Sequence, residues 1–153
     1  MSVQTQLHAL PAHRKLLVGA GALLFVDSFL PWYHLDFGPA SLNLSGWHEI
    51  GSLAWTLLLL VLLWEGVRLT GAAPLQGRRA DLATGIGTLG AVALGAIYVL
   101  ERLGDGSVGV GLLIGVVLLV VLAVAAVRVF RAGGGRDALR DEVAAARGRG
   151  PSA

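Results

Sequence analysis

Four long apolar runs limit most strongly how this chain can fold. They lie at about residues 14–31, 50–69, 82–101 and 107–130. A helix needs roughly 20 mostly apolar residues to cross the hydrocarbon core of a bilayer, which is about 30 Å thick. We therefore predict an all-α integral membrane protein, in which residues 1–132 form an antiparallel bundle of four transmembrane helices.

Composition agrees with this prediction and excludes several classes of function. Of the 153 residues, 55% are hydrophobic and only 14% are charged, whereas soluble domains carry about 25% charged residues. The chain has no cysteine, which excludes disulfides, thiolate catalysis and cysteine-ligated zinc. The formal net charge of +2 is too small to indicate a nucleic-acid partner.

The positions of arginine and lysine indicate how the four predicted spans are oriented. Of the twelve basic residues, only Arg102 lies in the first or third connection between spans. The other eleven lie near the N-terminus, around the second connection or at the C-terminal end. Because basic residues stay on the cytoplasmic side, we expect both termini to be cytoplasmic. Arginine outnumbers lysine eleven to one, a bias of GC-rich genomes, so we expect a multi-pass protein of a bacterial plasma membrane.

Between the first and second spans the pattern changes to a period of two residues. Apolar and polar side chains alternate on both sides of a Gly-Pro turn, which predicts a small extracytoplasmic β-hairpin at about residues 32–47. The register that pairs Phe37 with Leu42 puts the apolar side chains of both strands on one face, with Trp32 and Trp47 paired at the base. A lone two-stranded hairpin is marginal in water, so we expect it to lie over the bundle with its apolar face down. The alternative is an irregular loop that dips into the headgroups.

Six polar residues are expected near the outer face and form the candidate functional or structural cluster: Asp27, His34, Asp36, His48, Glu49 and Arg102. Asp27 comes one turn before Pro31, near the outer end of the first span, where a charge costs less than at the bilayer centre. It is expected either to be hydrated or bonded to Ser28, His48 or Arg102, or to handle an ion or proton. The histidines and carboxylates do not have the spacing of a known metal site, so no metal is predicted.

Small and aromatic residues suggest how the spans pack and where they meet the interface. The third span carries a stripe of small residues at four-residue steps, and the fourth carries two glycines at the same spacing: Ala83, Gly87, Ala91, Gly95, Gly111 and Gly115. Small residues let helices approach closely in lipid, so we predict that the third and fourth spans form a tight antiparallel pair. Four aromatic residues are expected to anchor the protein at the interfaces: Trp32, Tyr33, Trp47 and Trp64. Glu65 can pair with Arg68 one turn on and is expected to serve as an anchor too.

The C-terminal residues 133–153 are expected to form a flexible, basic cytoplasmic tail. Three successive glycines, residues 133–135, provide the joint. The segment Arg136–Arg147 can form a helix of about three turns, which is marginal in isolation. It is expected either to remain solvated or to touch anionic lipid or a partner.

One sequence pattern is similar to that of a known group of proteins. The segment Phe29–Tyr33 (FLPWY), followed after a polar loop by Ser45–Trp47 (SGW), resembles uncharacterised small four-span membrane proteins of high-GC Gram-positive bacteria. In those proteins LPW closes the first helix and SGW opens the second. The similarity covers about the first 60 residues; it implies the fold and the location, and no activity.

No arrangement of nucleophile, base and orienting group is visible in the chain. We therefore expect a protein that is not an enzyme and has no cofactor. The predicted role is that of an accessory or scaffolding subunit, which acts through helix packing and its extracytoplasmic loop. Its partners would be the lipid bilayer and either another membrane protein or a second copy of the chain. The alternative is a small oligomeric transporter or channel that uses Asp27.

Overall fold

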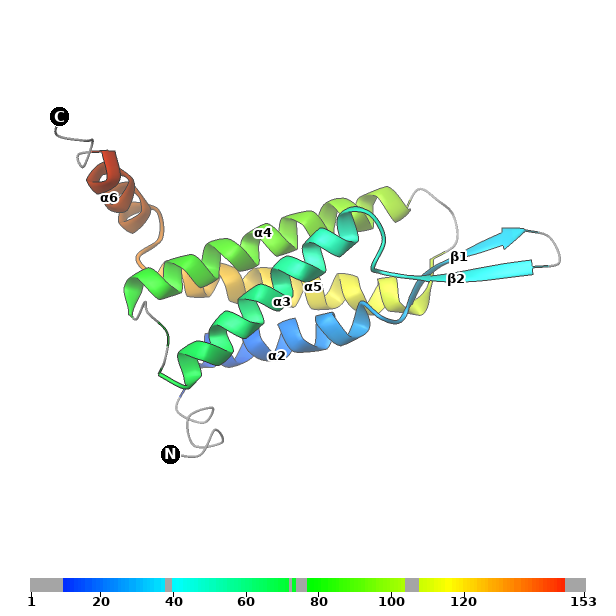
Figure 1. Cartoon of the computed structure of the whole chain (residues 1–153), viewed down its shortest axis with the longest axis horizontal. Coiled ribbons are helices and arrows are strands. Elements are labelled where there is room, and N and C mark those ends of the chain that lie inside the picture. The colour runs from blue at the N-terminus through cyan, green and yellow to red at the C-terminus, as the bar shows by residue number, and fades with distance from the viewer. Residues whose placement is uncertain (1–9, 38–39, 72, 74–76, 104–107, 148–153) are drawn as a thin grey trace.

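The computed structural model describes residues 10–37, 40–71, 73, 77–103 and 108–147, and these residues form five helices and one hairpin (Figure 1). The helices are α2 (Ala12–Asp27), α3 (Ile50–Leu69), α4 (Arg78–Leu103), α5 (Val110–Ala132) and α6 (Gly135–Arg147). The hairpin consists of β1 (Pro31–Phe37) and β2 (Ala40–Ser45).

Helices α2 to α5 run alternately up and down and pack side by side (Figure 1). Helix α4 packs against α3 and α5, as the predicted pairing of the third and fourth spans requires, and α2 packs against the same two helices. The hairpin extends from one end of this bundle, which we call the hairpin end. The other end carries most of the described arginines, and we call it the arginine end.

Among the described helices, α3, α4 and α5 are long and apolar enough to cross a membrane. Helix α3 has the predicted bounds, whereas α4 is longer than predicted at both ends and α5 begins at Val110 instead of residue 107. The predicted first span, residues 14–31, is only partly helical, because α2 has 16 residues and ends at Asp27. Proline disfavours a helical conformation in the residue before it, so the helix ends before Pro31.

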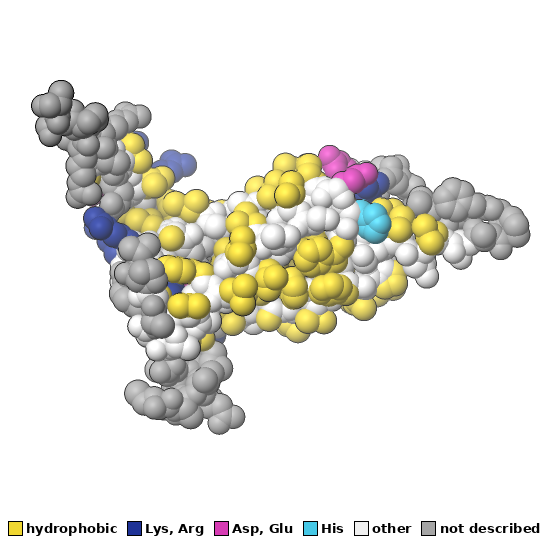
Figure 2. Space-filling model, viewed as in Figure 1, with side chains coloured by type: hydrophobic (Ala, Val, Ile, Leu, Met, Phe, Trp, Pro, Cys, Tyr) yellow, Lys and Arg dark blue, Asp and Glu magenta, His cyan; other side chains and the backbone are white. Residues whose placement is uncertain are grey.

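The outside of the bundle is apolar along its length. Leu23, Leu53 and Val117 are each more than 60% exposed, and Leu100 is 70% exposed. On the face shown in Figure 2, the charged side chains lie at the two ends with apolar surface between them. A water-soluble protein rarely exposes so much continuous apolar surface, so this belt fits a membrane environment.

The hairpin forms as predicted, but its register and position differ from the prediction. Leu35 pairs with Leu42, so the predicted pairing of Phe37 with Leu42 is wrong by two residues. The reason is a shorter connection: β2 already begins at Ala40, and only residues 38–39, which lie outside the described residues, join the strands. The hairpin does not lie over the bundle but projects beyond the helix ends (Figure 1).

Candidate functional site

Trp32 lies in the interior of the hairpin end, where we had predicted an interface anchor. Its side chain is fully buried. The indole Nε1 donates a hydrogen bond to the backbone oxygen of Asp27 at 3.0 Å. The ring lies 5.1 Å from the Trp55 ring and 5.7 Å from the Tyr98 ring, measured between centroids. Trp32 therefore fastens the start of the hairpin to α2, α3 and α4.

Trp47, the predicted partner of Trp32 at the hairpin base, packs elsewhere. Its ring centroid lies 5.3 Å from that of Phe29 and 5.9 Å from that of Phe25. Its Nε1 donates to Ser28 Oγ at 2.8 Å. Trp47 therefore packs against the end of α2, whereas Trp32 lies in the interior of the bundle.

Gly111 and Gly115 of α5 make room for the Trp32 side chain. A Cβ atom on Gly111 would lie 2.8 Å from Trp32 Cδ1, and one on Gly115 would lie 2.6 Å from Trp32 Cζ2. We had predicted that these two glycines let α5 approach α4. Their nearest neighbours belong instead to the segment around Trp32, and in the case of Gly115 to Asp27 as well.

The predicted small-residue stripe of α4 is divided between its neighbours. A Cβ on Gly87 would meet Val61 of α3 at 3.0 Å, whereas one on Gly95 would meet Leu119 of α5 at 3.0 Å. Ala91 is buried and Ala83 is exposed. Gly87 therefore serves the contact with α3 and Gly95 the contact with α5, whereas Ala83 lies on the surface.

Gly46, in the SGW segment, connects that segment to the end of α2, which precedes the LPW segment. Its N–H donates to the backbone oxygen of Ser28 at 2.9 Å. Its own backbone oxygen accepts a hydrogen bond from Trp55 Nε1 at 2.8 Å. A Cβ at this position would lie 3.0 Å from the Trp55 nitrogen and 3.1 Å from the Ser28 oxygen. The LPW and SGW segments therefore form one structural joint between the end of α2 and the start of α3.

Asp27, the first member of the candidate polar cluster, is 3% exposed. Among the described residues, neither of its carboxylate oxygens has a hydrogen-bond partner. The position of a Cβ on Gly115 lies 3.0 Å from Asp27 Oδ2, so the carboxyl group points at α5. A buried carboxyl group without a partner is costly, which makes Asp27 the most unusual polar group in the described bundle.

The three partners predicted for Asp27 are bound elsewhere. Ser28 Oγ donates to a backbone oxygen within α2 at 2.6 Å. His48 Nδ1 lies 3.3 Å from the Ser45 backbone oxygen. Arg102 forms an ion pair at 2.7 Å with Glu49, another member of the predicted cluster.

The remaining members of the predicted cluster do not gather around Asp27. The Arg102 guanidinium lies over the buried Tyr33 ring, 4.8 Å from its centroid, so Tyr33 is also an interior residue. His34 bonds to Asn43 across the hairpin, and the side chain of Asp36 is not among those described. Within the described part of the chain, no three histidine or acidic side chains lie close enough together to hold a metal ion.

A buried ionic network at the arginine end was missed by the sequence analysis. Glu65 is 1% exposed and forms ion pairs with Arg14 of α2 and, at 2.8 Å, with Arg68. Thr84 of α4 donates to Glu65 Oε1 at 2.5 Å. Arg68 also bonds to Asp81 of α4 at 2.8 Å. We refer to these residues as the Glu65 network; it ties α2, α3 and α4 together.

The sequence held one signal of this network, the spacing of Glu65 and Arg68 by three residues in an apolar helix. We had interpreted the pair as a surface anchor. Arg14 and Thr84 come from other helices, and nothing local to Glu65 indicates them. Trp64, the fourth predicted interface anchor, is half-buried, and its Nε1 has no partner among the described residues.

Comparisons with known proteins assign neither a family nor a function to this chain. No protein-family model matches this chain, and no curated protein or solved structure matches it either.

Proposed function

We propose that this protein is a four-span, non-enzymatic integral membrane protein that acts as an accessory or scaffolding subunit through its projecting hairpin. The observation that carries this proposal is the position of the hairpin, which extends beyond the helix ends (Figure 1). The proposed location is a bacterial plasma membrane. The resemblance of the LPW and SGW segments to small four-span proteins agrees with this proposal.

Helix α2 serves as the fourth span in this proposal. Its 16 residues measure about 24 Å at a rise of 1.5 Å each, which is close to the hydrocarbon thickness of about 30 Å. Phe29 and Leu30 follow the helix and are 60% and 43% exposed, so they extend its apolar surface. The bilayer accommodates a mismatch of a few ångströms at modest cost.

The arginine end faces the cytoplasm in this proposal, and the hairpin faces outward. Arg14, Arg78 and Arg131 lie near the ends of α2, α4 and α5 at the arginine end, whereas Arg102 lies at the hairpin end. Basic residues accumulate on the cytoplasmic side of membrane proteins. This distribution supports cytoplasmic termini.

The hairpin offers a surface for protein contact because a two-stranded sheet has two edges. Strand edges carry unpaired N–H and C=O groups that can pair with an extended segment of another chain. At the base of β1 the edge is occupied, since Tyr33 forms a backbone bridge with Val108. Leu42 in β2 is 50% exposed and adds apolar area beyond the bundle. The proposed partner is either another membrane protein or a second copy of this chain.

Site-specific photo-crosslinking in the native host tests this role. A photoreactive residue at Asn43, on the hairpin, is expected to capture one discrete protein partner. The same residue at Leu60, which is 57% exposed on the bundle surface, is the control and should capture lipid. If neither Asn43 nor Leu42 captures a protein, while the control position captures lipid, the scaffolding role is wrong.

A second candidate function is favoured by Asp27, whose carboxyl group has no hydrogen-bond partner among the described residues. Acidic residues within spans often belong to ion or proton paths. In an oligomeric transporter or channel, Asp27 would be the coupling group. Asp27→Asn should then abolish an ion or proton flux measured in proteoliposomes. Unchanged flux would exclude this role, and the scaffolding role predicts that the variant folds and binds its partner normally.

A further inference from the structure

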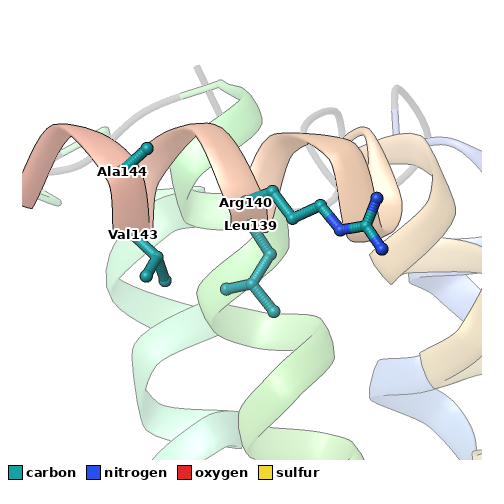
Figure 3. Close-up of a pocket in the computed structure, with 4 residues that line it drawn as sticks. All are labelled: Leu139, Arg140, Val143 and Ala144. Atoms are coloured by element: carbon teal, nitrogen blue, oxygen red, sulfur yellow. The ribbon is translucent and has the colours of Figure 1, made fainter.

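Helix α6 projects from the arginine end at an angle to the bundle helices and does not continue along α5 (Figure 1). Leu139 and Val143 project from α6 toward the side on which the bundle helices lie, and Ala144 points the other way (Figure 3). These two apolar side chains are 39% and 43% exposed, and they line an open groove of about 540 Å³ together with Arg140 and Ala144. If the bundle crosses a bilayer, α6 lies at the headgroup level with an apolar face toward the hydrocarbon, as interfacial amphipathic helices do.

A second groove lies between the end of α5 and the start of α6. It has a volume of about 700 Å³, and its lining includes Val127, Phe130, Arg131 and Arg136. A neighbouring groove of about 310 Å³ shares Val127 and Arg131 and adds Val124 and Arg128. We call the two together the α5–α6 groove. One part of it is apolar and the other part is basic.

The apolar part of the groove continues a track of exposed valines along α5. Val117, Val120, Val124 and Val127 are 63%, 61%, 45% and 36% exposed. Their spacing places them on one face of the helix. The track therefore leads from the apolar belt of the bundle directly to the arginines, a path that suits an acyl chain.

The basic part of the groove has an excess of positive charge. Among the described residues, no carboxylate lies within ion-pairing distance of Arg128, Arg131 or Arg136. Asp137 lines the groove as well, so it offsets one of these charges in part. The remaining arginines present hydrogen-bond donors to an external anion at the expected depth of the lipid headgroups.

We propose that the α5–α6 groove binds one anionic phospholipid, with the phosphate group held by Arg131 and Arg136 and an acyl chain lying on Val124 and Val127. This inference rests on the proposed membrane insertion with the arginine end facing the cytoplasm. Anionic lipids are attracted to basic pockets on that side of membrane proteins. The combination of charge with a continuous apolar track favours a lipid over a soluble anion or a peptide.

Spin-labelled lipids test the proposal on the full-length protein. The protein is reconstituted in phosphatidylcholine vesicles that contain a trace of spin-labelled phosphatidylglycerol or phosphatidylcholine. Electron spin resonance then gives the association constant of each lipid with the protein surface. The wild type is expected to prefer phosphatidylglycerol. Each arginine that contacts the phosphate should contribute about fivefold to that preference, so Arg131→Gln with Arg136→Gln should remove it.

The single substitution Arg136→Gln should weaken the preference about fivefold. Its matched control is Arg140→Gln, because Arg140 lies on the same helix outside the α5–α6 groove and the variant loses the same single charge. It should keep the preference. Val127→Trp fills the apolar part without changing charge and should weaken the binding of phosphatidylglycerol. The fraction of spin-labelled phosphatidylcholine that the protein immobilises should be the same in all variants. This result would show that the bundle is intact in each of them.

Three results would overturn the proposal: no preference in the wild type, an equal loss in the Arg140→Gln control, or a preference that survives the double substitution. An equal loss in the control would show diffuse charge attraction, and capture of a peptide or protein by the groove would identify a different occupant. If neither lipid were immobilised, the chain would not be inserted and both proposals would fail. The hairpin crosslink is not expected to change in these variants, so the scaffolding role and the lipid site otherwise fail separately.

Discussion

Gly115→Ala tests most directly how Trp32 is held inside the bundle. A Cβ atom at this position would lie 2.6 Å from Trp32 Cζ2 and 2.7 Å from Trp32 Cη2, which is too close for any stable contact. The indole is not free to turn away, because its Nε1 is hydrogen-bonded and its ring packs on Trp55 and Tyr98. The added methyl group must therefore displace Trp32 or α5.

The size of the effect follows from two opposing contributions. Overpacking a well-packed core costs about 1–3 kcal/mol, whereas replacing glycine by alanine within a helix gains about 1 kcal/mol. Gly66 of α3 provides the control, since nothing lies within 4 Å of a Cβ built there. Gly66→Ala receives only the gain. The free energy of unfolding of Gly115→Ala should therefore be about 1–3 kcal/mol below that of Gly66→Ala.

The free energy of unfolding can be measured in detergent micelles by titration with sodium dodecyl sulfate, followed by far-ultraviolet circular dichroism. A Trp32→Phe background sharpens the test, because phenylalanine lacks the outer indole atoms that the methyl group meets. The two substitutions should couple by about 0.5–3 kcal/mol. Equal stability of Gly115→Ala and Gly66→Ala, without coupling to position 32, would refute the placement of Trp32.

Three further predictions concern the ionic network, the hairpin and the orientation. Glu65→Gln should lower the free energy of unfolding by about 3–5 kcal/mol, because it leaves Arg14 without an ion-pair partner among the described residues and leaves the buried Arg68 with Asp81 alone. Glu49→Gln, at a side chain that is 70% exposed, should change the free energy of unfolding by less than about 1 kcal/mol. Similar effects of the two substitutions would contradict the buried network. In this cysteine-free chain, Leu35→Cys with Leu42→Cys should form a disulfide faster than Phe37→Cys with Leu42→Cys, and the reverse order would restore the register predicted from sequence. Reporter domains fused to the two chain ends should be active only in the cytoplasm, and extracytoplasmic activity at either end would invert the proposed orientation.

The helices were largely predictable from the sequence. An apolar run of about 20 residues can satisfy its backbone in apolar surroundings only as a helix, and α3 has the predicted bounds Ile50–Leu69. The end of α2 was less predictable. Pro31 indicated that the helix stops, but the structure ends it at Asp27, four residues earlier.

The alternating pattern of the hairpin indicated which side chains share a face, but not how the strands pair. A shift of two residues keeps every side chain on its face. The predicted pairing of Phe37 with Leu42 and the observed pairing of Leu35 with Leu42 therefore satisfy the same pattern. Only the length of the turn distinguishes them, and the Gly-Pro sequence allowed both.

Local sequence determined where helices form and that their outer surface is apolar, because periodicity and length act within each segment. It could not determine whether Trp32 meets lipid or protein, since an indole suits both environments. The approach of α5, with Gly115 opposite the ring, placed Trp32 inside. In the same way, Glu65 and Arg14 are 51 residues apart, and only the packing of α2 against α3 brings them together. The tertiary structure decided these contacts because they depend on which helices are neighbours and how each is rotated, and neither property is encoded within a single helix.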